Sequence, residues 1–140
     1  MKPIVIDPSA AGAWIMPDEA TDAAMELYAQ ARSDEHLFHA PQLWPWEMGN
    51  MLAMGHRLQR ITAEEVEQGL QLLAAANINL DAPAGLHRQA QVGRLALTHQ
   101  LTYYDAAYLE LVLRLNGQLA SLDAKLLAAA RACGIVCLSF

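Results

Sequence analysis

The chain is poor in cysteine and basic residues and has no long apolar run. Its two cysteines, Cys133 and Cys137, have no second pair of ligands for a zinc site, so we expect buried, reduced thiols. No stretch approaches the roughly 18 apolar residues of a membrane span. The apolar run before Asp7 is too short for a secretory signal, so we expect a cytoplasmic protein with no membrane partner.

The shortage of basic residues gives the chain a negative charge. Lys and Arg number 9 against 15 Asp and Glu, for a formal net charge of −6. Such a charge argues against a nucleic-acid partner, because phosphate binding favours a basic surface. The objection weakens if acids hold cations, since bound metal inverts the local charge. Apolar residues are plentiful at 54%, enough to bury one core, and we expect a single domain over residues 1–140.

Short apolar segments alternate with longer segments of helical periodicity. The predicted strands are 3–6, 37–40, 78–80, 119–122 and 135–138, and the predicted helices begin near 17, 44, 62, 86, 106 and 123. The helix from Pro17 would turn Ala20 and Ala24 toward the core, and in helix 106–115 only Glu110 and Arg114 should face water. Alternation with uniformly apolar strands predicts an α/β sandwich whose parallel sheet is covered by helices on both faces.

Four acidic residues fall at the places where this fold would bring them together. They are Asp7, Glu47, Asp105 and Asp123. Asp7 and Asp123 directly follow strands, whereas the other two lie near the starts of helices. Ligands bind beyond the carboxyl ends of the strands in an open parallel sheet, where helix N-termini also gather. We therefore expect the four carboxylates to meet at one edge of the sheet.

Carboxylates gathered in this way repel one another and lose hydration unless a cation lies among them. Ligands that offer only oxygen select hard ions, so we expect Mg²⁺ or Mn²⁺, one or two per site. Such ions activate water and stabilise the departing oxygen in phosphodiester hydrolysis. Three neighbouring polar residues would orient the carboxylates by hydrogen bonding: Ser9, Asn50 and Ser121.

Four segments, in order from residue 3 to the end, resemble the acidic motifs of PIN-domain toxins of the VapC type. The segments are Val5-Ile6-Asp7-Pro8-Ser9, Pro41-x-Leu43-Trp44-x-x-Glu47-x-x-Asn50-x-Leu52, Tyr104-Asp105-Ala106-Ala107-Tyr108-Leu109-Glu110-Leu111 and Leu119-Ala120-Ser121-Leu122-Asp123-x-Lys125-Leu126. Each motif alone is weak, but four in order at compatible spacing are strong. This chain departs from the pattern only in Ser121, where threonine is frequent, and in the bulky Pro45 and Trp46 beside Glu47.

The resemblance implies a PIN-like three-layer α/β/α sandwich with a central five-stranded parallel sheet, and a homodimer. It further implies Mg²⁺- or Mn²⁺-dependent endoribonuclease activity on RNA, neutralised by a cognate VapB-like antitoxin. Carried over position by position, the catalytic and metal-binding residues would be Asp7, Glu47, Asp105 and Asp123, supported by Ser9, Asn50 and Ser121.

Other interpretations of the same residues remain open. Asp105 and Asp123 could simply cap helices, where aspartate is favoured. The chain could also be a non-catalytic PIN-like module that binds RNA or protein, although the complete acidic quartet counts against that. A receiver-like phosphoacceptor domain would need adjacent acids after the first strand, and here Asp7 is followed by Pro8 and Ser9.

The basic and aromatic residues give a weaker indication of how a substrate would bind. Lys125, Arg57 and Arg60 are candidates for phosphate contact at the rim of the site, although solvated side chains are their ordinary state. The three tryptophans, Trp14, Trp44 and Trp46, could stack on RNA bases, but burial is the more common fate.

Overall fold

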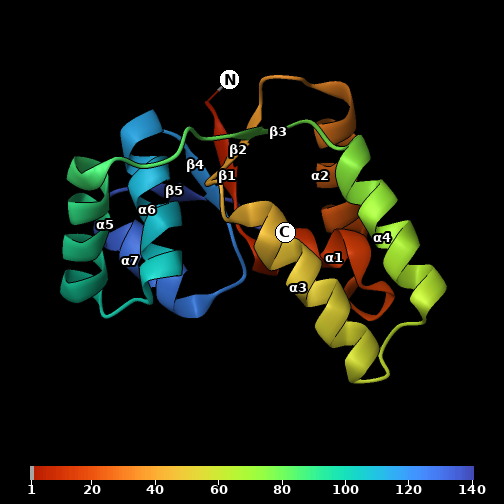
Figure 1. Cartoon of the computed structure of the whole chain (residues 1–140). Helices are drawn as coiled ribbons and strands as arrows, with labels where there is room; N and C mark the ends of the chain where they lie inside the picture. Colours follow the sequence, from red (N-terminus) through yellow and green to blue (C-terminus); the bar gives the residue numbers. More distant parts are fainter. Residues whose placement is uncertain (1) are drawn as a thin grey trace.

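The computed structural model describes residues 2–140, which form one five-stranded sheet with helices on both sides (Figure 1). The strands are β1 (Ile4–Ile6), β2 (Phe38–Ala40), β3 (Ile78–Leu80), β4 (Gln118–Ala120) and β5 (Val136–Cys137). They pair in the order β3-β2-β1-β4-β5, and every pairing is parallel. The predicted parallel α/β sandwich is confirmed, and each strand lies where its apolar segment predicted it.

The helices form two layers, one on each face of the sheet (Figure 1). One layer contains α1 (Pro8–Ile15), α2 (Asp22–Ser33), α3 (Trp44–Arg57) and α4 (Ala63–Ala75), and the other contains α5 (Leu86–His99), α6 (Tyr103–Leu115) and α7 (Ala124–Ala132). Along the chain, β2 pairs with β1 and β3 pairs with β2, after which β4 pairs with the other edge of β1 and β5 pairs with β4. Because such crossovers are right-handed, reversing direction moves the helices to the opposite face.

Local sequence signals account for most helix boundaries. Thr62 and Glu65 form the predicted capping box of α4, with both reciprocal hydrogen bonds present. Thr102 caps α6, which therefore begins at Tyr103, and Asn116 ends the helix in the left-handed conformation at φ 50°. These boundaries follow from side chains near the helix ends, so they could be found from sequence.

The region after β1 differs from the prediction. Pro17–Glu19 form a short 3₁₀ helix (η1) rather than the start of a long helix, and Thr21 caps α2 instead. Ala20 is consequently exposed, whereas Ala24 is buried as expected. The hydroxyl of Thr21 accepts the Ala24 amide at 3.1 Å, which gives α2 a better N-terminus than Pro17 could provide.

Glu110 was expected to face water, and this prediction is wrong. Its side chain is buried, with 6% of the residue exposed, and Arg114 Nε donates to it at 2.9 Å. Arg114 also pairs with Asp81, which follows β3 and is held by Arg88 at 2.8 Å. The segment that joins β3 to α5 crosses α6 (Figure 1), so Glu110 is buried in an ion-pair network whose other members stay partly exposed. Arg114 faces water as predicted.

The close pairing of β1 with β4 places the ends of these two strands side by side. Gly117 precedes β4, and a Cβ atom at this position would lie 2.5 Å from the carbonyl oxygen of Pro3. The neighbouring Gln118 amide donates to the same oxygen at 2.8 Å. The resulting register pairs Ile6 with Ala120.

Two further sequence expectations concern the surface and the thiols. Within the described residues 2–140, no helix combines the length and the apolar character needed to cross a membrane. Cys133 and Cys137 are free thiols, and both are half-buried.

Candidate active site

The candidate site lies beyond the carboxyl ends of β1 and β4. These are the adjacent strands at which the strand order changes direction, since β2 and β3 lie on one side of β1 and β4 and β5 on the other. Open α/β sheets bind ligands at this point, because the connections leave the two adjacent strands toward opposite faces. The Asp7 amide donates to the Ala120 carbonyl at 3.1 Å, which continues the strand register by one residue. Asp7 therefore lies beside Ser121, and the Ser121 hydroxyl donates to Asp7 Oδ2 at 2.7 Å.

Each of the four predicted acids lies at the N-terminus of a helix. Asp7 is the N-cap of α1 and Asp123 the N-cap of α7, whereas Glu47 and Asp105 lie in the first turns of α3 and α6. The N-terminal end of a helix carries partial positive charge, which stabilises nearby anions. Four helix dipoles therefore point at this edge of the sheet and partly offset the repulsion among the carboxylates.

Asp7 is the most buried of the four acids, with 2% of the residue exposed. Ser9 Oγ donates to Asp7 Oδ1 at 2.7 Å, Ser121 Oγ donates to Oδ2 at 2.7 Å, and the Ala10 amide donates to Oδ1 at 3.0 Å. Burial raises the pKa of Asp7 above its ordinary 3.8, the hydrogen bonds from Ser121 and Ser9 oppose this, and the charge of Asp105 adds to it. The carboxylate is thus held in one orientation.

The two serines also connect the ends of the strands. Ser9 Oγ accepts the Leu122 amide at 2.8 Å, and Ser121 Oγ accepts the Asp123 amide at 3.0 Å. Ser9 and Ser121 therefore contact Asp7 in the manner that the sequence predicted. Their functional role in supporting Asp7 stays a prediction.

Glu47 is half-buried and receives a hydrogen bond across the two helical layers. The Tyr108 hydroxyl donates to Glu47 Oε1 at 2.7 Å, and Tyr108 is fully buried. Burial raises the pKa of Glu47 above 4.5, the bond from Tyr108 lowers it, and the charges of Asp105 and Asp7 raise it. The same burial, together with the charge of Glu47, raises the pKa of Tyr108.

The sequence analysis assigned no role to Tyr108. One signal was available, because Tyr108 lies three residues after Asp105 and therefore on the same face of α6. Its partner Glu47 is 61 residues away in the chain. Only the packing of α3 against the site brings these two side chains together.

Asp105 lies among the other three carboxylates. Burial raises its pKa above 3.8 and the charge of Asp123 raises it further, whereas a hydrogen bond with Thr102 acts in the opposite direction. Asp105 in turn raises the pKa of both Asp7 and Glu47. Each of the four acids therefore lies within electrostatic reach of at least one other, as the strand-end argument predicted.

The donor chemistry of this cluster fits a hard divalent cation. The donors are carboxylate oxygens, and the pKa values of Asp7, Glu47 and Asp105 are raised first by burial and further by the charge of a neighbouring acid. Across residues 2–140, no three Asp, Glu, His or Cys side chains lie close enough to form a ready-made cage for an ion. Mg²⁺ ordinarily takes one or two carboxylates directly and completes its coordination with water, a mode that needs no such cage.

The other predicted residues lie farther from the carboxylates or make no contact with them. Asn50 is exposed on α3, and Lys125 is exposed in the first turn of α7 beside Asp123. Arg57 ends α3, roughly 15 Å along the helix axis from Glu47. Arg60 lies beyond it and pairs with Asp18 at 2.8 Å. The structure therefore brings neither arginine to the site.

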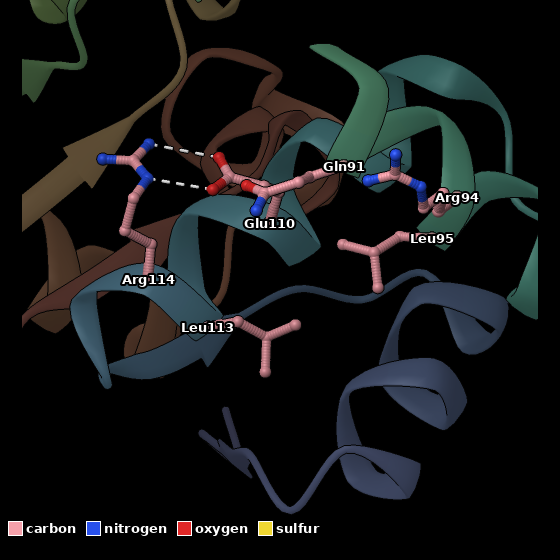
Figure 2. Close-up of a pocket in the computed structure, with 6 residues that line it drawn as sticks. All are labelled: Gln91, Arg94, Leu95, Glu110, Leu113 and Arg114. Atoms are coloured by element: carbon pink, nitrogen blue, oxygen red, sulfur yellow. Dashed lines mark hydrogen bonds and ion pairs between the residues drawn. The ribbon is translucent and has the colours of Figure 1, made fainter. Parts of the chain in front are cut away.

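The largest of the surface hollows, at about 530 Å³, does not contain the acidic cluster. Figure 2 shows its lining, in which α5 contributes Arg94 and Leu95 and α6 contributes Leu113 and the Glu110–Arg114 ion pair. The Glu110 carboxylate is already bonded twice to the Arg114 guanidinium. The candidate active site is therefore identified by its chemistry and not by the size of a cavity.

Comparisons with known proteins agree with the fold and the motif order. No family model matches the chain. A protein named Ribonuclease VapC3 from Pyrobaculum aerophilum is 31% identical over 127 residues, which cover 88% of this chain and 91% of that protein. The crystal structure of PAE2754 from the same organism superposes with a TM-score of 0.71 at 23% identity, covering 97% of this chain and 83% of that one, and it supports the fold. The extent of the match to VapC3, over a sheet that carries the acidic motifs in the expected order, shows that this chain belongs to the VapC family of PIN-domain proteins.

Proposed function

We propose that this chain is a Mg²⁺- or Mn²⁺-dependent endoribonuclease toxin that hydrolyses RNA phosphodiester bonds in the cytoplasm. The observation that supports the proposal is the placement of Asp7, Glu47, Asp105 and Asp123 at helix N-termini, with the charge of Asp105 within electrostatic reach of the other three. The 31% identity to a protein named Ribonuclease VapC3 supports the same activity.

The acidic cluster would hold one or two divalent ions, with water completing their coordination. When bound, the metal supplies an activated water and charge stabilisation for the departing 3′ oxygen, which yields a 5′-phosphate product. Ser9 and Ser121 hold the Asp7 carboxylate in a fixed orientation, and Tyr108 does the same for Glu47. The helix N-termini that converge here favour a phosphate as well as the carboxylates.

The electrostatics of the site favour a catalytically active site over one that has lost its activity. Asp7, Glu47 and Asp105 all have raised pKa values, so their charged forms are held at a cost in the metal-free protein. In a module that only bound protein or RNA, the charge of Asp105 beside Asp123 would be a cost without a use. A cation that stabilises the carboxylates gives a reason for their presence.

Cleavage of a labelled single-stranded RNA in Mg²⁺ or Mn²⁺, with sequencing of the new ends, tests this proposal. Asp7→Asn and Asp105→Asn should abolish cleavage while the circular dichroism spectrum stays that of the wild type. Glu64→Gln is the matched control, because Glu64 is an exposed acid in the first turn of α4. Metal-dependent cleavage that survives either site change would remove the mechanism. RNA binding without any cleavage by the wild type would favour the non-catalytic module.

The homodimer and the VapB-like antitoxin belong to the same proposal. Sedimentation equilibrium should give twice the mass of the chain, and the product of a short gene directly upstream should copurify and suppress cleavage. A monomer over the whole range of protein concentrations would contradict the dimer without affecting the chemistry.

A further inference from the structure

Two aromatic side chains stand exposed beside the acids of the candidate site. Trp46 is 83% exposed and directly precedes Glu47, and Tyr104 is 63% exposed and directly precedes Asp105. The other two tryptophans, Trp14 and Trp44, are 3% and 4% exposed. The burial expected of tryptophan therefore holds for two of the three, and the exception adjoins a candidate catalytic residue.

The position of Tyr104 follows from helix geometry. Tyr104 lies four residues before Tyr108 and thus on the same face of α6, and the Tyr108 hydroxyl reaches Glu47. Helical side chains lean toward the N-terminus of their helix, which here is the end that carries the site. Tyr104 is therefore an exposed residue in the first turn of α6, one turn before the tyrosine that bonds Glu47.

Trp46 belongs to the opposite helical layer. It lies in the first turn of α3, and its neighbour Glu47 turns inward to receive the Tyr108 hydroxyl. Asn50 lies one turn later and is also exposed, so no element described here covers this face of α3. The Tyr108–Glu47 hydrogen bond joins α6 to α3, so the two exposed rings belong to the first turns of two helices that are in contact across the site.

The charge of the chain makes these rings important for binding a polyanion. Of the 9 Lys and Arg residues, Arg60, Arg88 and Arg114 are already paired with carboxylates. With a net charge of −6, the surface gains little from contact with phosphates. Aromatic stacking on bases does not depend on surface charge, and removing one stacked side chain typically weakens binding by about tenfold.

We propose that Trp46 and Tyr104 are stacking platforms for two bases of a single-stranded RNA, one on each side of the phosphate that lies over the acidic cluster. This inference rests on the proposed function. Stacking of this kind requires unpaired RNA, because bases in a duplex are stacked on one another and cannot reach these rings.

The tryptophan content makes this proposal directly measurable. Trp46 is the exposed tryptophan, so a base that stacks on it should quench the accessible part of the protein fluorescence while the buried part remains. The titration uses an RNA oligonucleotide of about eight nucleotides, within the range of known single-strand sites. Ca²⁺ without Mg²⁺ or Mn²⁺ prevents turnover during the measurement. We expect quenching by the single strand and little by the same sequence as a duplex.

Variants test each ring by the anisotropy of fluorescently labelled RNA. Trp46→Ala and Tyr104→Ala should each weaken binding about tenfold, whereas Trp46→Phe and Tyr104→Phe should retain most of the affinity because a ring remains. Leu58→Ala is the matched control, since Leu58 is 62% exposed and lies just past the end of α3, roughly 15 Å or more along the helix axis from Glu47. The affinity of the control should equal that of the wild type.

The outcomes separate this inference from the proposed function. Unchanged RNA affinity in both alanine variants, with cleavage intact, would overturn the stacking proposal and leave the nuclease proposal standing. If RNA quenched the tryptophan fluorescence as expected but the protein never cleaved RNA, the stacking proposal would stand and the nuclease proposal would fall. If Trp46→Ala halved the mass of the free protein, Trp46 would be a subunit contact, and the stacking proposal would be overturned. Equal affinity for single-stranded and duplex RNA would overturn it as well.

Discussion

The hydrogen bond from Tyr108 to Glu47 can be tested by removing the hydroxyl alone. Tyr108 is fully buried, and its hydroxyl lies 2.7 Å from Glu47 Oε1, so Tyr108→Phe leaves the packing of the ring unchanged and deprives a half-buried carboxylate of its donor. A hydrogen bond to a charged group is worth about 1.5–3 kcal/mol. We expect the free energy of unfolding to fall by about 2 kcal/mol at pH 7.5, which for 140 residues lowers Tm by about 7 °C.

The pH dependence of this loss gives a second readout. Because burial raises the pKa of Glu47 above 4.5, more than half of its carboxyl groups are protonated in the folded protein at pH 4.5, and the bond in those molecules is a neutral one. A neutral bond is worth about 1 kcal/mol, so Tyr108→Phe should cost about half as much there. Urea unfolding in chelator at both pH values measures the two losses.

A double-mutant cycle isolates the pair. In the Glu47→Ala background the Tyr108 hydroxyl is buried without its acceptor, so Tyr108→Phe should become neutral or stabilising. Equal destabilisation in the wild-type and Glu47→Ala backgrounds would show that the hydroxyl matters for some reason other than Glu47. A loss that grows at pH 4.5 would refute the charge argument.

Three further predictions concern the metal, the sheet and the buried ion pairs. In chelator, stability should rise as pH falls from 7.5 toward the ordinary aspartate pKa of 3.8, because raised pKa values mean that the folded state binds protons more tightly than the unfolded state. Asp105→Asn should raise the metal-free Tm and reduce the gain from Mn²⁺, which in the wild type is about 2.7 kcal/mol at one hundred times the dissociation constant; a lower Tm in chelator would contradict this. Gly117→Ala should destabilise by about 1–3 kcal/mol because its Cβ would meet the Pro3 carbonyl oxygen, and an unchanged urea midpoint would count against that close approach. Arg114→Met should cost about 3 kcal/mol at neutral pH by leaving Glu110 buried without its partner, and simultaneous Glu110→Gln should recover part of it; no recovery would mean that the arginine acts through packing alone.

Sequence reasoning worked best where a signal is local. The capping box at Thr62, the cap at Thr102 and the stop at Asn116 each act within one helical turn, so the residues that set a boundary are adjacent to it. The central strands β1, β2 and β4 were found because parallel strands buried on both faces read as short apolar runs, and the edge strands β3 and β5 keep the apolar run although they are partly exposed. The start of α2 was missed because Pro17 and Thr21 are both acceptable N-terminal signals four residues apart.

The candidate site was predicted in outline for a related reason. Each acid is recognisable locally, because it follows a strand or lies at the start of a helix. The rule that ligands bind beyond the carboxyl ends of parallel strands then predicts that the four acids share one site. Tyr108 has no such local signal. Its role depends on a contact with Glu47 across 61 residues of chain, and a buried tyrosine in an apolar helix is otherwise an ordinary core residue.

By itself the sequence determined the α/β alternation and the extent of most elements, and it predicted the four acids of the candidate site, because these depend on hydrophobic periodicity and on residues within a turn of each other. The tertiary structure alone decided which polar side chains are inside. Glu110 is buried because the segment after β3 crosses it, Tyr108 reaches Glu47 because α3 and α6 converge, and Trp46 remains exposed because the helix turns that face away from the core. Burial is a property of what packs over a residue, and in this chain those covering segments are distant in sequence.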